Sequence, residues 1–271
     1  ALAAAQVFVL CLAPAATMLL YPREVGAPPP PARSVEGLPA GPPACACGAP
    51  GGEPCGDPGK EAEAEAENRC RRAVVCGCLL MTMTRQLVVQ GVEAGTSMVL
   101  ERRYGWHARE VALVIALVFL NCIPLKTIHT FTAGRLSILG WIRAFGVAGL
   151  LATAALFQYP GVPRAAGAMT LLLGDSLLFP CLIITDGMTL GLLQQHVLPR
   201  GSVFDANCSA LWIGLFSRML GGLGAVLARG TMEAYGPNAY ALQQVLLCST
   251  FLLLFEGVVR PNLVSGKPAA V

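Results

Sequence analysis

Charged side chains inside long apolar stretches are the residues of this sequence most able to do chemistry. Asp175 and Asp186 lie in the apolar run 169–196, and Arg218 lies in the run 210–228. Each run is close to the ~20 residues that a helix needs to cross a bilayer. A charge at the centre of such a helix costs about 2.5–3.5 kcal/mol, so it normally faces an opposite charge, a water-filled cavity or a solute path. The sequence therefore predicts a multi-span membrane protein with charged groups in its interior.

A stripe of polar side chains adds to these charges in an earlier apolar run. Its members, four, three and four residues apart, are Gln86, Gln90, Glu93 and Ser97. At 3.6 residues per turn they share one narrow helix face, which indicates a face turned toward a cavity or a polar neighbour. The alternative is interhelical hydrogen bonding without a transport role, because amides and hydroxyls commonly join membrane helices in this way. An ionised Glu93 is harder to explain by that alternative, since one amide does not compensate a carboxylate.

The roles of the mid-span charges remain open at this level. Asp175 and Asp186 are three turns apart on one face, and Pro180 between them is expected to bend the helix. Asp186 is the preferred site residue, whereas Asp175 is either a second site residue or a charge at the membrane surface. Arg218 is expected either to pair with Asp186 or Glu93 as a structural ion pair, or to bind an anionic solute through its planar guanidinium.

Other polar residues carry weaker signals. Arg143 and Glu256 lie near span ends, where long side chains extend to the membrane surface. Small residues four apart, Ser217, Gly221 and Ala225, indicate close helix packing. Linker cysteines at 45, 47, 55 and 70 lack paired zinc-ligand spacing, so reduced thiols are expected there. No metal cluster, phosphate-cradling glycine loop or nucleophile–base motif is present, so we expect no metal, no cofactor and no enzymatic activity.

Composition supports a membrane protein. The 271 residues are 55% hydrophobic and 13% charged, with a mean hydropathy of +0.61, whereas a soluble domain has about 25% charged residues. The net charge of +3 gives no nucleic-acid footprint. The predicted order is an apolar span over 1–22, a disordered Pro/Gly-rich linker over 23–72, six spans within 73–260 and a polar tail over 261–271. Within the linker, the run EAEAEAE is expected to form a short solvated helix that leads into the membrane. The six spans are placed at 73–100, 109–131, 137–157, 165–190, 208–228 and 240–259.

Basic residues indicate the orientation of these spans. Arg69, Arg71 and Arg72 stand directly before the first of the six, which places the linker in the cytoplasm. One span, a long cytoplasmic linker and six further spans match the last helix of one six-helix bundle followed by a second bundle, the layout of major facilitator transporters. The first residue is Ala, so we expect a fragment whose N-terminal six-helix bundle is missing; a cleaved signal peptide at the start is the alternative.

Two stretches carry a family resemblance. The run GVEAGTSMVLERRYGWHAREVALVIALVFLNCIPL resembles the seventh and eighth helices of the SPX-MFS transporters, the vacuolar phosphate carriers of plants and their relatives. DGMTLGLLQQHVLPRGSVFDANCSALWIGLFSRMLGG resembles their tenth and eleventh helices. The resemblance covers roughly residues 73–262 and places Glu93, Asp186 and Arg218 at matching charged positions. No SPX domain is present in these residues, and the loop TIHTFTAGRLS lacks the Gly-x-x-x-Asp core of the superfamily.

These observations predict an all-α polytopic transporter of the major facilitator type with about seven transmembrane helices. It would carry a small anionic, phosphate-like solute by alternating access, with Glu93, Asp186 and Arg218 lining the cavity and an acid available to carry a coupling proton. The expected location is a vacuolar, lysosomal or plasma membrane. The rival hypothesis is a non-transporting receptor-like or scaffolding bundle, in which the polar stripe is fully paired from helix to helix.

Overall fold

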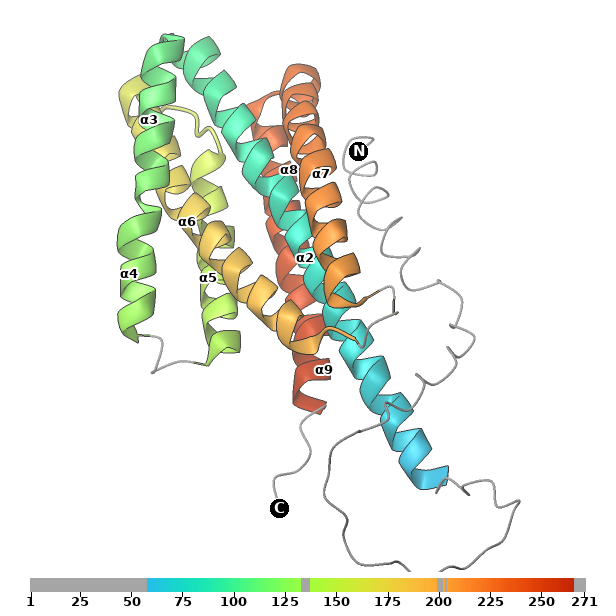
Figure 1. Cartoon of the computed structure of the whole chain (residues 1–271). Coiled ribbons are helices and arrows are strands. Elements are labelled where there is room, and N and C mark those ends of the chain that lie inside the picture. The colour runs from blue at the N-terminus through green and yellow to red at the C-terminus, as the bar shows by residue number, and fades with distance from the viewer. Residues whose placement is uncertain (1–57, 133–136, 199–201, 203, 266–271) are drawn as a thin grey trace, which may run out of the picture.

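The computed structural model describes residues 58–132, 137–198, 202 and 204–265, and these residues form helices joined by short links, without a strand (Figure 1). The elements are α2 (Pro58–Tyr104), α3 (Ala108–Leu120), α4 (Cys122–Thr132), α5 (Ile138–Ala152), η1 (Thr153–Leu156), α6 (Arg164–His196), α7 (Ala206–Tyr235), α8 (Pro237–Leu254), η2 (Phe255–Val259) and α9 (Arg260–Ser265). Six helical stretches are long and apolar enough to cross a membrane. The all-α class and the six spans expected after residue 72 are therefore confirmed.

Part of the sequence-based description lies outside the described residues. This part comprises the expected first span over 1–22, most of the linker with Cys45, Cys47 and Cys55, and the last residues of the tail. The end of the linker is described and is helical: α2 begins at Pro58 and includes the run EAEAEAE, for which the sequence predicts a short helix. Exposed pairs one turn apart, Glu65–Arg69 and Glu67–Arg71, support this polar first part of the helix.

Helix α2 is the central element of the bundle. It crosses the bundle diagonally between α6 and α7, with α8 behind it (Figure 1). In its most apolar window 78% of the residues are buried, compared with 11% in the window of α7. A helix that is apolar all round belongs in the interior, so any polar side chain on α2 must be matched by a neighbouring helix.

Glycines allow the neighbours of α2 to approach closely. A Cβ atom on Gly224 of α7 would lie 2.7 Å from the carbonyl oxygen of Leu87, so the two backbones touch there. On the α8 side, Tyr240 lies over Gly95 and Gln244 lies over Gly91. Gly221 also faces α2, whereas Gly214 and Gly222 face open space. The expected close packing of this helix is therefore made by Gly221 and Gly224.

Two proline-containing spans behave differently. The second span of the bundle is divided into α3 and α4 at Asn121, where Pro124 lacks the N–H and blocks the carbonyl one turn earlier. In contrast, α6 continues as one helix through Pro180.

The last span passes from α8 through the π-helical turn η2 into α9.

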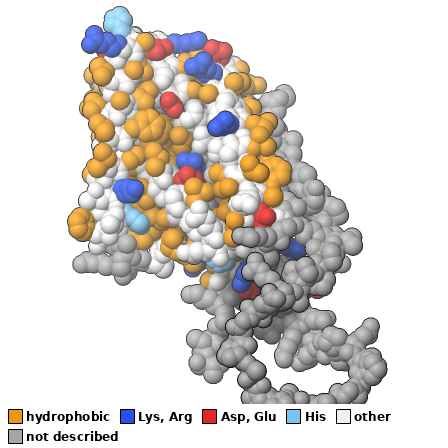
Figure 2. Space-filling view, in the orientation of Figure 1, with side chains coloured by type: hydrophobic (Ala, Val, Ile, Leu, Met, Phe, Trp, Pro, Cys, Tyr) orange, Lys and Arg blue, Asp and Glu red, His pale blue; other side chains and the backbone are white. Residues whose placement is uncertain are grey.

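The spans alternate in direction, so α2 begins at the end of the bundle where α9 finishes (Figure 1). Figure 2 shows the face carrying α2 and α6: hydrophobic side chains cover its middle, and acidic and basic side chains gather at its upper end. Within the apolar middle, one basic and one acidic side chain lie side by side (Figure 2). An apolar belt with a charged rim is the pattern expected of a bilayer-spanning bundle.

Candidate solute site on the central helix

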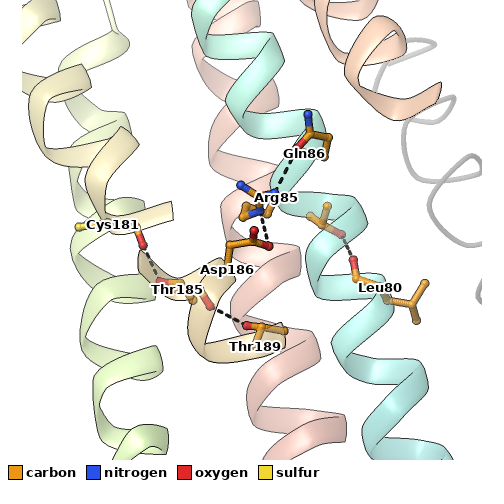
Figure 3. A network of polar contacts seen from close by, with 8 residues as sticks. Leu80, Arg85, Gln86, Cys181, Thr185, Asp186 and Thr189 are labelled. Atoms are coloured by element: carbon orange, nitrogen blue, oxygen red, sulfur yellow. Dashed lines mark hydrogen bonds and ion pairs between the residues drawn. The ribbon is translucent and has the colours of Figure 1, made fainter. Parts of the chain in front are cut away.

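An ion pair joins α2 to α6 in the middle of the bundle. Arg85 Nε lies 2.8 Å from Asp186 Oδ1, and the two side chains are only 11% and 20% exposed (Figure 3). Arg85 also donates from Nη2 to Gln86 Oε1 over 3.1 Å. These two contacts use a minority of the five N–H donors of a guanidinium, so the group has capacity to bind a further acceptor.

The hydroxyl groups around this pair are occupied within their own helices. Thr185 donates to the carbonyl oxygen of Cys181 over 2.5 Å, and Thr189 donates to that of Thr185 over 2.9 Å (Figure 3). On α2, Thr84 donates to the carbonyl oxygen of Leu80 over 2.9 Å. Threonines in apolar helices commonly satisfy their hydroxyls in this way. Arg85 is therefore the principal partner of the Asp186 carboxylate.

The predicted polar stripe continues along α2 from this pair. Gln90 Nε2 donates to Glu93 Oε2 over 3.3 Å, and Ser97 Oγ donates to the Glu93 carbonyl oxygen over 2.8 Å. Gln86 and Gln90 face α7 at Gly221. Between Val74 and Leu100, the four members of the stripe and Arg85 are partly buried, whereas the other α2 residues are buried. The stripe is therefore the least covered face of the central helix.

A groove between α2 and α3 lies at the far end of the stripe. Its volume is about 430 Å³, and Glu93, Ser97 and Glu101 form its polar wall. The opposite wall is apolar and comes from α3, with Val111, Ala112, Ile115, Ala116 and Phe119. Polar groups on one side and apolar groups on the other are typical of small-molecule sites.

Arg218 does not join Asp186 or Glu93, so the expected structural ion pair with either acid is wrong for this conformation. The Asp186 carboxylate contacts Arg85, and the Glu93 carboxylate accepts from Gln90. Arg218 is exposed on α7, at helical spacing from the exposed side chains of Leu211 and Leu215. The three charged residues assigned to one cavity therefore occupy separate places: Asp186 at the α2–α6 contact, Glu93 at the groove and Arg218 on the open face of α7.

Asp175 lies inside the bundle and is not exposed at its surface. Its side chain is buried, with the residue 1% exposed, and Oδ2 accepts a 2.7 Å hydrogen bond from Thr96 Oγ1 on α2. Arg143 and Glu256 also differ from expectation because they pair with each other, Nε to Oε1, over 2.9 Å. Glu256 Oε2 additionally accepts from Arg260 over 2.6 Å.

Arg85 is a residue of the candidate site that the sequence patterns did not single out. The signal was present, since Arg85 directly precedes Gln86 and lies deep in the span. Among the residues that the structure describes, no three His, Cys, Asp or Glu side chains are grouped as metal ligands would be. Comparison with protein-family models, with curated proteins and with solved structures finds no match to this chain.

Proposed function

We propose that this chain forms the C-terminal part of a membrane carrier of the major facilitator type that moves a small anionic, phosphate-like solute by alternating access. The observation that supports it best is the Arg85–Asp186 pair, held in the middle of the central helix at the start of a partly covered polar stripe. A charged pair at this depth is costly unless it serves a path or a partner. The planar fork of arginine matches the oxygens of a phosphate-like anion.

In this proposal the solute competes with the Asp186 carboxylate for Arg85. When the site is empty, Asp186 occupies the guanidinium and α2 remains joined to α6. When the anion binds, it takes over these donors through charge-assisted hydrogen bonds, and the two helices are free to separate. Gln86 and Gln90, the next residues of the stripe, have neutral amide groups that can donate hydrogen bonds to the anion. Glu93 and Ser97 line the groove, and Arg218, which is exposed on α7, would face a further helical bundle if the carrier contains one.

The rival function, a non-transporting bundle, also has an observation in its favour, since Asp186, Thr185 and Glu93 all have partners within the chain. The two hypotheses differ in water access. Single cysteines placed at Gln86, Gln90 and Ser97, in a variant without native cysteines, would react with a membrane-impermeant thiol reagent only if the stripe lines a path. Uniform protection of all three positions in every condition would support the rival.

Uptake of inorganic phosphate by proteoliposomes that contain the full-length protein tests the proposal directly. Arg85→Gln should reduce uptake by about 10- to 100-fold, since a hydrogen bond to a charged group contributes about 1.5–3 kcal/mol. Arg102→Gln is the matched control, because Arg102 lies on the same helix but pairs with Glu233 at an exposed position. Equal uptake by the wild-type protein and Arg85→Gln would refute the assigned role.

A further inference from the structure

A second carboxyl group of α6, outside the candidate solute site, is buried without a cation. Asp175 is 1% exposed, and none of the ion pairs among the described residues includes it. One of its oxygens accepts from Thr96, and Oδ1 has no hydrogen-bond partner within the described part of the chain. This situation contrasts with Asp186 on the same helix, whose charge is balanced by Arg85.

The surroundings of Asp175 contain hydroxyl groups and apolar side chains. Tyr240 of α8 is buried over Gly95, and its hydroxyl is near both Thr96 and Asp175. The Tyr240 hydroxyl, like Asp175 Oδ1, has no hydrogen-bond partner of good geometry within the described residues. The neighbouring turn of α6 packs on η1, where Gly174 meets Ala155. The titratable groups that face this cluster are therefore Tyr240 and, further along α8, Cys248.

An ionised carboxylate in this position would be severely destabilised. Moving a charge into a protein interior costs several kcal/mol even after relaxation, and only a cation with good geometry offsets that cost. The single hydroxyl of Thr96 does not offset this cost. A neutral carboxylic acid carries no charge and has an O–H group that can donate a hydrogen bond. The nearby Tyr240 oxygen can accept this hydrogen bond.

We propose that Asp175, with Thr96 and Tyr240, forms a proton-binding site in which the carboxyl group is protonated while α2, α6 and α8 are packed as in this structure. Separation of α2 from α6 would hydrate the carboxyl group, which then releases its proton to water as H₃O⁺ and becomes a carboxylate. Repacking requires that the carboxylate first takes a proton back from water. The ligand of the site is thus the proton itself.

The groove between α2 and α3 offers an approach for water. Phe119 lines this groove, and its ring packs on Phe179 with the centroids 4.8 Å apart. Phe179 lies one turn along α6 from Asp175. Movement of α3 that parts the two rings would bring water from the groove to within about one turn of the carboxyl group. If the proposed transport function holds, this step would couple proton movement to solute movement, and only that coupling rests on the proposed function.

Infrared difference spectroscopy of the full-length protein in lipid bilayers tests the site without any transport measurement. At about pH 6, two units above the ordinary aspartate pKa of about 3.9, the wild-type protein should show the C=O stretching band of a protonated carboxylic acid, and the band should shift in D₂O. Asp175→Asn should remove the band. Glu93→Gln and Glu233→Gln, which change carboxyl groups outside this cluster and outside the Arg85–Asp186 contact, should retain it.

Two milder variants keep the proposal falsifiable if Asp175→Asn does not fold. Thr96→Val and Tyr240→Phe each remove one hydroxyl at nearly constant volume, and each should shift the band because the hydrogen bonding of the acid changes. Absence of the band in the wild-type protein, its persistence in Asp175→Asn, or an unchanged band in both hydroxyl variants would overturn the proposal. A protein that shows the band but does not take up phosphate would retain the proton site and lose the proposed transport function.

Discussion

The strength of the Arg85–Asp186 pair can be measured by a double-mutant cycle with Arg85→Met and Asp186→Leu. Removal of one partner of a buried ion pair leaves an uncompensated charge and typically costs about 3–5 kcal/mol. Because the two side chains retain 11% and 20% exposure, we expect each single variant to lose about 3 kcal/mol, at the lower end of that range. The double variant replaces both charges by apolar groups of similar size and should recover most of the loss. If the double variant loses about 1 kcal/mol, the coupling energy should therefore be about 5 kcal/mol.

The bundle contains its own control for this cycle. Arg102 and Glu233 also join two helices, α2 and α7, over 3.0 Å, but their side chains are 65% and 55% exposed. Exposed pairs contribute about 0.2–1 kcal/mol, so the same cycle there should give a coupling energy in that range. Unfolding by SDS in mixed micelles supplies the free energies for both cycles. Equal coupling energies for the two pairs would refute the conclusion that Arg85 and Asp186 depend on each other in a low-dielectric interior.

Four further substitutions test the packing and the surface charges. Gly224→Ala should destabilise the bundle by about 1–3 kcal/mol, because its Cβ would meet the α2 backbone. The control is Gly222→Ala, which faces open space and should be neutral or stabilising by up to about 1 kcal/mol. Equal melting temperatures of the two variants in detergent would contradict the close contact. Gly236→Ala should lower the free energy of unfolding by about 1–3 kcal/mol, because Gly236 connects α7 to α8 at φ +87° and ψ 175°, a backbone region open essentially to glycine alone. An unchanged free energy of unfolding would contradict this strain. Glu256→Gln should lower stability by no more than about 1 kcal/mol, with the loss diminishing in high salt, because its partner Arg143 is mostly exposed; a larger, salt-independent loss would place the pair in the interior.

The spans and the polar stripe could be predicted because each depends on spacing along a single helix. Bilayer thickness sets the length of an apolar run, and the 3.6-residue period places Gln86 and Ser97 on one face. The partner of Asp186 depends instead on which helices are neighbours and in what register. Arg85 and Arg218 both lie in mid-span, but α2 lies between α6 and α7 (Figure 1), so α7, the helix that carries Arg218, is on the other side of α2 from α6. No single-helix pattern contains that information.

The spacing of the two α6 aspartates becomes meaningful once α2 is placed beside them. Asp186 contacts Arg85, and Asp175 contacts Thr96. The two aspartates are 11 residues apart on α6 (186 − 175), and their two partners are also 11 residues apart on α2 (96 − 85). Equal spacing in opposite directions is the register of two antiparallel helices, and the two contacts are therefore parts of one interface, about 16 Å apart along the axis. One contact is balanced by a cation and the other has only hydroxyls. Separation of α2 from α6 would free Arg85 from the Asp186 carboxylate, so that an anion can take its place. It would also expose the Asp175 carboxyl group, which can then lose a proton. The same helix movement thus acts on both groups, which is the physical requirement for linking an anion to a proton.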